Sequence, residues 1–376
     1  MKNLIALLNA NALKVMIVLQ LISFSFTNAQ WNFQLSTNQE FNSNPFRSVD
    51  PTSDFISTFD VGIQKEISDF SLLYYGSYNK FNTSTEIDYY WHQLGFFKET
   101  ESITWGAYFE QRFNRDVNDF FNYLNYAAYI RKPFQLFDFS WEANISYSSM
   151  NYSVIPDFNN WVVASGLSTR RSFETKTTIF ASAILNYKGF KNYYSNIDSS
   201  FGTHNVLLNS ESVNITQLVL NARIAQSLAE NTGLALNYNL KKILSGSGFS
   251  ASLIESTYGE IELYEDPVSQ EGYSVGALLT QILPADITLK LAYSYADKSY
   301  PSQGIYLSET EENLDVSRND IQTYFSTSIS KPFYFDNESG SELNLKLNYQ
   351  LIKNTSNSYF FNYDINTVSL SLYFIF

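Results

Sequence analysis

Apolar and polar side chains alternate strictly along the C-terminal end of the chain. The apolar positions are Val368, Leu370, Leu372, Phe374 and Phe376. The residues between them are mostly small or hydroxyl-bearing, and side chains in a strand point to opposite faces in turn. The pattern therefore predicts a strand over 365–376 with one apolar face, one polar face and an aromatic tip.

Similar alternation recurs along the rest of the chain, in segments of about ten residues or more, the length of a tilted strand that crosses a hydrocarbon layer. We predict about sixteen strands, with fourteen or eighteen as alternatives. They fall near 31–42, 55–67, 70–81, 87–98, 102–113, 120–131, 137–149, 159–170, 175–187, 215–228, 233–244, 272–283, 286–298, 319–331, 340–353 and 365–376. No stretch after residue 29 offers 18 consecutive apolar residues, which excludes helical spans.

The connections alternate between short and long. Ser68-Asp69 and Pro284-Ala285 are typical of the short ones, whereas 188–214, 245–271 and 299–318 are long. Backbone groups in lipid must all be paired, so a membrane sheet has to close. The pattern thus predicts an all-β fold, a closed antiparallel transmembrane β-barrel with short periplasmic turns and long outer loops. The alternative, a secreted β-sandwich or solenoid, is disfavoured by long strands and the lack of a short repeat.

The N-terminus has the features of a secretory leader. Lys2 and Lys14 are its only charged residues, an apolar run covers 15–24, and the small residues around Ala29 suit a cleavage site. We predict a signal peptide over 1–29 and a single barrel domain over 30–376, without a plug domain before the first strand. A transmembrane anchor is the alternative, but the run is shorter than the roughly 20 residues that a span needs.

Composition narrows the function classes. There is no cysteine, so disulfide and thiol chemistry and an N-terminal lipid anchor are excluded. Removing the two leader lysines from the 24 basic residues leaves 22 against 37 acidic residues, a net charge of −15. No basic patch is present, which disfavours nucleic-acid binding.

The leader, the two-residue repeats, the alternating turns and loops and the terminal residues 370–376 together resemble bacterial outer-membrane β-barrel proteins of porin-like type. The resemblance implies an outer-membrane location. It also implies that the barrel-assembly machinery reads the terminal strand, with Leu372, Phe374 and Phe376 as the assembly signal. The even strand number places both termini in the periplasm.

Polar residues on the inner-facing side of the predicted strands are candidates to line a pore. They are Glu66, Glu110, Arg112, Glu142, Asn144, Lys176, Arg223, Lys241, Lys290 and Lys346. Sixteen strands enclose enough space for an aqueous channel. In the alternative, these groups pair with one another and close the lumen.

Two other groups of residues are candidates for chemistry. The acidic loops, around 255–271 and at Glu309 to Asp315, contain carboxylates that could bind divalent cations. The spacing from Glu309 to Asp315 does not match a calcium loop, and a solvated, mutually repelling outer surface is favoured. His92, with Asp88 on the same strand face, and His204 in a long loop are candidate hydrolase residues, but two histidines cannot build a three-histidine zinc site.

The leading hypothesis is a porin-like channel for passive diffusion of small hydrophilic solutes or ions, without catalytic activity, cofactor or metal. A non-conducting barrel that acts as a receptor, scaffold or secretion-machine component is the alternative, and a membrane-embedded hydrolase is the third. The expected partners are outer-membrane lipid and the assembly machinery, and a homo-oligomer is compatible with the sequence.

Overall fold

A computed structural model describes residues 31–115, 119, 121–190, 214–248, 265–335 and 341–376. Its strands are β1 (Trp31–Asn42), β2 (Asp54–Ile67), β3 (Phe70–Phe81), β4 (Tyr89–Glu99), β5 (Thr104–Asn114), β6 (Tyr123–Leu136), β7 (Phe139–Tyr152), β8 (Asn160–Ser172), β9 (Thr177–Phe190), β10 (Asn214–Ala229), β11 (Thr232–Gly246), β12 (Glu271–Leu283), β13 (Ile287–Tyr300), β14 (Ile305–Tyr306), β15 (Glu312–Asn313), β16 (Arg318–Tyr334), β17 (Glu342–Ser356) and β18 (Tyr363–Ile375). Single 3-10 turns lie at η1 (Thr85–Ile87), η3 (Pro156–Phe158), η4 (Pro284–Asp286) and η5 (Tyr359–Phe361).

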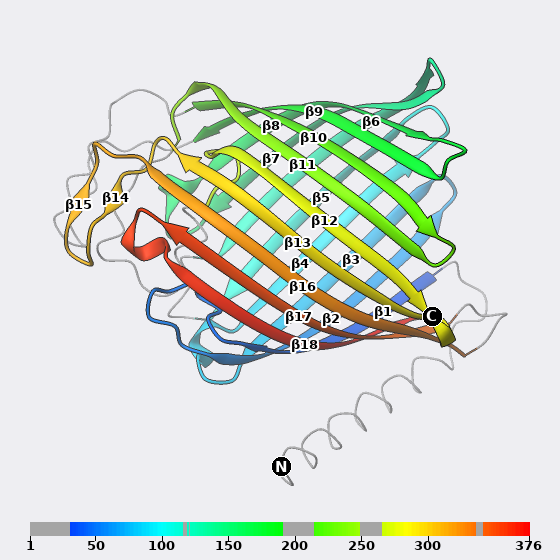
Figure 1. Cartoon of the computed structure of the whole chain (residues 1–376), viewed down its shortest axis with the longest axis horizontal. Coiled ribbons are helices and arrows are strands. Elements are labelled where there is room, and N and C mark those ends of the chain that lie inside the picture. Colours follow the sequence, from blue (N-terminus) through cyan, green and yellow to red (C-terminus); the bar gives the residue numbers. More distant parts are fainter. Residues whose placement is uncertain (1–30, 116–118, 120, 191–213, 249–264, 336–340) are drawn as a thin grey trace, which may run out of the picture.

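Sixteen of these strands form one closed antiparallel barrel, in which each strand pairs with its neighbours in the chain and β18 returns to β1 (Figure 1). Leu35 on β1 lies opposite Phe374 on β18, which confirms the expected pairing of the first and last strands. The short strands β14 and β15 form a separate two-stranded hairpin in the connection between β13 and β16. This hairpin was not predicted, because two-residue strands leave no periodic signal.

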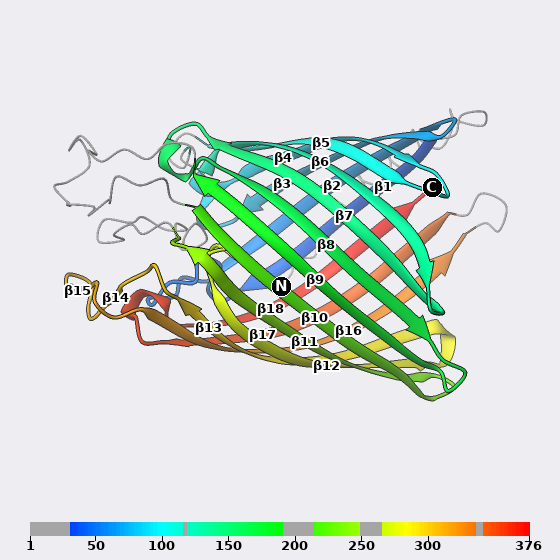
Figure 2. The same cartoon turned by 90° about the horizontal axis from the view of Figure 1, so that it is seen from above.

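The two ends of the barrel differ. One end, called here the short-turn end, has the connections 68–69, 100–103, 137–138, 173–176, 230–231 and 284–286. Several of these turns contain residues with positive φ, such as Asp138 at 61° and Ala285 at 62°, as tight hairpins require. The opposite end, called the loop end, has the longer connections, including 43–53 and 301–317 (Figures 1 and 2).

The two faces of the wall differ as the alternation predicts. Large apolar side chains point outward and stay exposed, as Leu94 (57% exposed) and Leu347 (50%) illustrate. The inward face is polar: Ser36 donates a hydrogen bond of 2.6 Å to Asp60 on the next strand. Since paired residues share a face, the register assigns every strand residue to one side.

Tight packing is concentrated at the loop end rather than in a central core. Tyr300 and Phe361 are each 1% exposed, and Ile215 and Arg318 are fully buried. These residues come from β10, β13, β16 and η5, so packing here fixes how the loops lie over the barrel mouth. Among the described residues, no helix is both long and apolar enough to cross a membrane.

Candidate functional site

The inward face of the barrel carries charges of both signs, unevenly distributed around the ring. On β1 to β7 the acidic residues are Glu40, Asp54, Asp60, Glu66, Glu99, Glu110 and Glu142. On β8 to β17 the basic residues are Arg170, Lys188, Arg223, Lys241, Lys290, Lys298, Arg318 and Lys346. Arg112, Arg131, Asp320 and Glu342 depart from this division. The division makes the potential differ from one side of the lumen to the other.

A segment of the connection between β11 and β12 folds into the mouth of the lumen. Residues 265–270, called here the inward segment, contact strands on nearly opposite sides of the ring. On one side, Gln217 of β10 donates hydrogen bonds to the backbone carbonyls of Pro267 (2.9 Å) and Gln270 (2.6 Å). On the other, the hydroxyl of Tyr363 on β18 donates to Glu265 (3.0 Å). The inward segment therefore narrows the lumen at the loop end.

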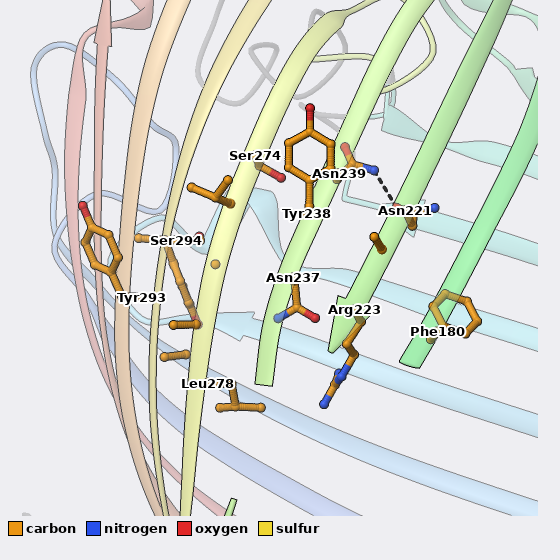
Figure 3. Close-up of a pocket in the computed structure, with 16 residues that line it drawn as sticks. Phe180, Asn221, Arg223, Asn237, Tyr238, Asn239, Ser274, Leu278, Tyr293 and Ser294 are labelled. Atoms are coloured by element: carbon orange, nitrogen blue, oxygen red, sulfur yellow. Dashed lines mark hydrogen bonds between the residues drawn. The ribbon is translucent and has the colours of Figure 1, made fainter. Parts of the chain in front are cut away.

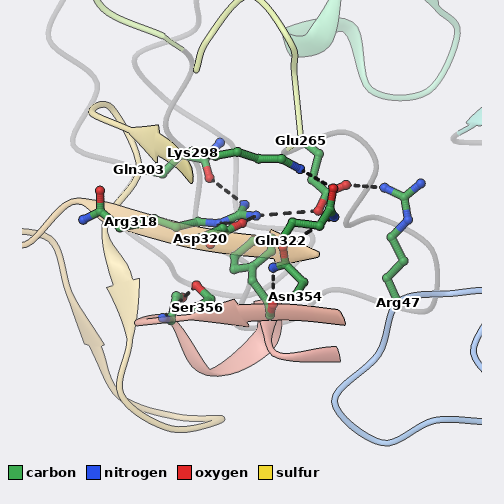
Figure 4. A network of polar contacts seen from close by, with 12 residues as sticks. Arg47, Glu265, Lys298, Gln303, Arg318, Asp320, Gln322, Asn354 and Ser356 are labelled. Carbon is green, nitrogen blue, oxygen red and sulfur yellow. Dashed lines mark hydrogen bonds and ion pairs between the residues drawn. The ribbon is translucent and has the colours of Figure 1, made fainter. Parts of the chain in front are cut away.

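Glu265 joins several distant parts of the chain (Figure 4). Its carboxylate forms an ion pair with Arg47 from the connection between β1 and β2, and lies 3.7 Å from Nη2 of Arg318. Two cations and the Tyr363 hydroxyl thus surround this largely buried carboxylate. Such charge-assisted contacts are stronger than neutral hydrogen bonds. We conclude that Glu265 is the main anchor of the inward segment on this side.

Arg318, one of the two cations beside Glu265, is itself held in place by several contacts. It is fully buried together with Asp320, and its Nε lies 3.0 Å from Oδ1 of Asp320. Its Nη1 donates to Gln303 (3.1 Å), and its guanidinium lies 4.1 Å from the ring centre of Tyr300 and 3.2 Å from that of Phe361. A buried charge of this kind is stable only with partners on every side. Arg318 therefore fixes the geometry of the loop end.

Asp266 holds the inward segment against the opposite wall. Its carboxylate lies 2.8 Å from Nζ of Lys188 on β9 and accepts hydrogen bonds from Ser269 and from the backbone N–H of Val268. Burial alone would raise the pKa of Asp266, but the Lys188 ammonium and these hydrogen bonds lower it below its ordinary value. Asp266 is thus a carboxylate at neutral pH. Between this segment and strands β5 to β9 a cavity of about 430 Å³ remains.

A second cavity, of about 510 Å³, lies along β9 to β13 (Figure 3). Arg223, Asn237, Asn221 and Asn239 contribute polar groups from β10 and β11, and Phe180 contributes an aromatic ring from β9. Asn239 donates a hydrogen bond of 2.6 Å to Asn221. Within the described ranges Arg223 makes no ion pair or hydrogen bond, so its guanidinium is open to the lumen.

The structure places the ten candidate lining residues as follows. Nine lie on strands with their side chains on the inward face: Glu66, Glu110, Arg112, Glu142, Asn144, Arg223, Lys241, Lys290 and Lys346. Lys176 lies in the turn between β8 and β9 with φ of 59°, since β9 begins at Thr177 and not at 175. Glu110 accepts a hydrogen bond from the Tyr123 hydroxyl, and Arg112 stacks 4.1 Å from the ring centre of Tyr89, so these two are partly engaged by the wall.

His92 does not pair with Asp88, as the hydrolase hypothesis requires. His92 shares the outward face with Leu94, and its Nδ1 lies 2.9 Å from the Tyr74 hydroxyl. Asp88 is buried and instead accepts hydrogen bonds from Tyr78 and from the backbone N–H of Phe81. The same-face reading fails because β4 begins only at Tyr89. His204 lies outside the described residues.

The acidic loops divide into two kinds. Glu265 and Asp266 are inside the mouth, whereas Glu309 accepts a hydrogen bond from Tyr359 on the outside. Glu255, Glu260 and Glu262 lie outside the described residues. Across the described ranges, no group of three histidine, cysteine or acidic residues could hold a metal ion.

The terminal residues pair firmly with the first strand. Leu372, Phe374 and Phe376 lie on the outward face. The backbone N–H of Phe376 donates to the carbonyl of Phe33 (3.1 Å), and their rings stack with centres 5.5 Å apart. The ring centres of Phe374 and Phe376 lie 5.1 Å apart, so the pairing between β1 and β18 ends in an aromatic cluster.

Comparison with solved structures defines the fold class. OccAB1 from Acinetobacter baumannii matches with a TM-score of 0.54 over 93% of this chain and 97% of that chain, at 8% identity. The outer membrane protein OpdK from Pseudomonas aeruginosa gives 0.53 over 92% and 98%, at 9% identity, and a BenF-like porin from Pseudomonas fluorescens gives 0.51 over 93% and 100%, at 9% identity. At such identities the likeness is one of fold: the chain has the closed barrel of the outer-membrane porins. No protein-family model matches the chain, and no curated protein matches it in sequence.

Proposed function

We propose that this protein is an outer-membrane channel for passive diffusion of small hydrophilic solutes or ions. The observation that supports this most is the polar, charge-divided inner wall, which leaves a cavity of about 430 Å³ beside the inward segment and another of about 510 Å³ along β9 to β13. The fold shared with OpdK and the BenF-like porin supports it as well. Opposite charges on two sides of a lumen orient polar solutes and give weak overall ion selectivity.

The proposal includes the orientation and the assembly route. Short turns belong in the periplasm and longer loops outside, so both termini would be periplasmic. The outward aromatic end at Phe374 and Phe376 would be the signal read by the assembly machinery. The inward segment would then narrow the pore from the external side.

Conductance in a planar lipid bilayer tests the proposal. The full mature chain should give stable openings, and releasing the inward segment with Glu265→Ala and Asp266→Ala should enlarge them. The matched control is Glu311→Ala with Glu312→Ala, which removes the same charge from the outer loop and should leave the conductance unchanged. Absence of current from both the correctly folded protein and the released variant would reject the channel and favour a non-conducting barrel.

Ion selectivity tests the role of the inner wall. Arg223 has no partner within the described ranges, so Arg223→Gln should change the reversal potential in a salt gradient without disturbing packing. Exposed loop charges are screened over roughly 8–10 Å at physiological ionic strength. Glu311→Gln with Glu312→Gln should therefore shift the potential less than Arg223→Gln does. A larger shift from the loop pair would place the selectivity determinant outside the barrel.

A further inference from the structure

The outer surface carries cations seated on aromatic rings at the short-turn end. Nζ of Lys65 lies 4.6 Å from the ring centre of Trp31, directly across the seam between β2 and β1. Nζ of Lys98 lies 4.7 Å from the ring centre of Phe70, its direct partner across β4 and β3. The same arrangement thus occurs twice, with the aromatic residue at the start of one strand and the cation at the end of the next.

Two further strands repeat this arrangement with small variations. The Arg171 guanidinium of β8 lies 5.0 Å from the ring centres of both Phe139 and Phe173. Nζ of Lys331 on β16 lies 5.1 Å from the ring centre of Phe333, two residues on along its own strand. All four cations are on strands that run toward the short-turn end, and each lies within its last few residues.

These four cations, called here the basic belt, occupy the outward face on the short-turn side of the apolar band. Lys98 follows Leu94 and Phe96 on the outward side of β4, and its side chain is only 27% exposed because it leans on Phe70. Long basic side chains at such a level place their stems in the apolar layer and their charges at the headgroups. Contact with a ring holds each charged group in one direction, whereas a lysine without such a contact moves freely on the surface.

The belt is only weakly neutralised by the protein itself. Lys98 lies 3.5 Å from Asp69 and Arg171 lies 3.8 Å from Asp138, but those two carboxylates are 62% and 86% exposed. Exposed pairs at such distances contribute little. Within the described ranges Lys65 and Lys331 have no acidic partner at all. Donors therefore remain for an anion from outside the protein.

We propose that the basic belt binds the phosphate groups of phospholipid headgroups in the leaflet at the short-turn end; this rests on the outer-membrane location proposed above. Lysine supplies a compact charge to a phosphate, and arginine supplies a fork that fits two of its oxygens. The anion is membrane lipid rather than free phosphate, because each cation lies at the rim of the apolar band. Acyl chains would lie against that band while the phosphate meets the cation.

The belt covers only part of the circumference. It follows the arc from β16 through β1 to β8, where Lys132 of β6 adds an outward cation without a ring. On the remaining arc the outward residues at this level are uncharged: Thr177, Ile179, Gln226, Leu228, Gln281 and Leu283. Tightly held anionic lipid should therefore be confined to one side of the barrel.

Electron spin resonance of the full mature chain in phosphatidylcholine vesicles can test this. Spin-labelled phosphatidylglycerol should be held more strongly than spin-labelled phosphatidylcholine. The variant Lys65→Gln/Lys98→Gln/Lys331→Gln should lose most of that preference, with binding at each altered site weakened about fivefold. The matched control Lys80→Gln/Lys242→Gln/Lys353→Gln removes the same charge from outward positions at the loop end and should keep the preference.

Equal losses in the two triple variants, or no loss in the first, would overturn the proposal. If the first triple variant fails to insert, Phe70→Leu keeps every charge and should still reduce the preference by displacing Lys98; an unchanged preference would reject the role of the rings. Millimolar inorganic phosphate at constant ionic strength should not compete, and competition would assign the belt to free phosphate. Conductance reports on the lumen instead, so failure of the channel proposal would be seen separately.

Discussion

Replacing Leu347 by arginine is the sharpest test of the wall's two faces. Leu347 lies near the middle of β17 on the outward face, half exposed, between Leu370 of β18 and Ile329 of β16. Arginine on the lipid face near the bilayer midplane costs about 2–4 kcal/mol. At roughly 1.4 kcal/mol per tenfold change, the ratio of folded to unfolded protein should fall about 30- to 700-fold.

The control is the same substitution at the next residue, Asn348. Asn348 points inward and lies opposite Ser328 and Ser369, in a polar environment that accepts a charge. Asn348→Arg should therefore stay within about 0.5 kcal/mol of the parent. Urea unfolding in lipid vesicles, followed by tryptophan fluorescence, measures both variants. Similar losses, or a larger loss for Asn348→Arg, would refute the register, since a one-residue slip exchanges the faces.

Three further outcomes follow from the structure. Deleting Phe376 removes its hydrogen bonds and stacking with Phe33 and should lower the amount of assembled barrel in the outer membrane; normal levels would contradict this. The pKa of Asp266 is lowered in the folded protein, so its contribution to docking the inward segment is complete above the ordinary value of about 4 and is lost as the pH falls through the lowered pKa. Conductance should then rise on acidification, and Asp266→Asn should abolish that rise. Asp320→Asn removes the nearest carboxylate of the buried Arg318 and leaves it only Glu265, at 3.7 Å. It should cost about 3–5 kcal/mol in the free energy of unfolding, more than Arg318→Met with Asp320→Leu.

The strands could be predicted from the sequence because one face meets lipid and the other meets water. The bounds of β1 and β3 agree with the expected ranges, and all sixteen barrel strands are present. The alternation is least clear near 87–98, because aromatic residues fall on both faces of that segment. The register resolves it: Trp91 faces inward and packs 5.5 Å from Tyr75, while His92 faces outward. Aromatic residues suit either side, so composition alone could not decide.

Depth in the membrane could not be obtained from alternation. Leu345 and Leu347 are both apolar positions flanked by polar residues in the same alternating segment. In the fold, however, Leu345 lies opposite Lys331 in the basic belt and Leu347 lies opposite Ile329. The first is near the rim and the second near the middle of the apolar band. Only the pairing with β16 distinguishes them, and that pairing depends on the stagger of the whole ring.

The residues of the barrel mouth were missed for a related reason. The carboxylate of Glu265 meets Arg47 at a separation of 218 residues and Tyr363 at a separation of 98. In the sequence, Glu265 and Asp266 belong to an acid-rich loop and are naturally read as part of a solvated surface. In the fold, they are the counterions of Arg318 and Lys188, which the inward wall provides. The net charge of −13 therefore overstates the negative potential inside, because two of those acids neutralise basic side chains at the narrowing. Further along β10 from Gln217 lies the guanidinium of Arg223, which makes no ion pair or hydrogen bond within the described ranges. For the channel proposed above, we therefore expect the balance of charge along the path, and not the total charge of the chain, to set the selectivity.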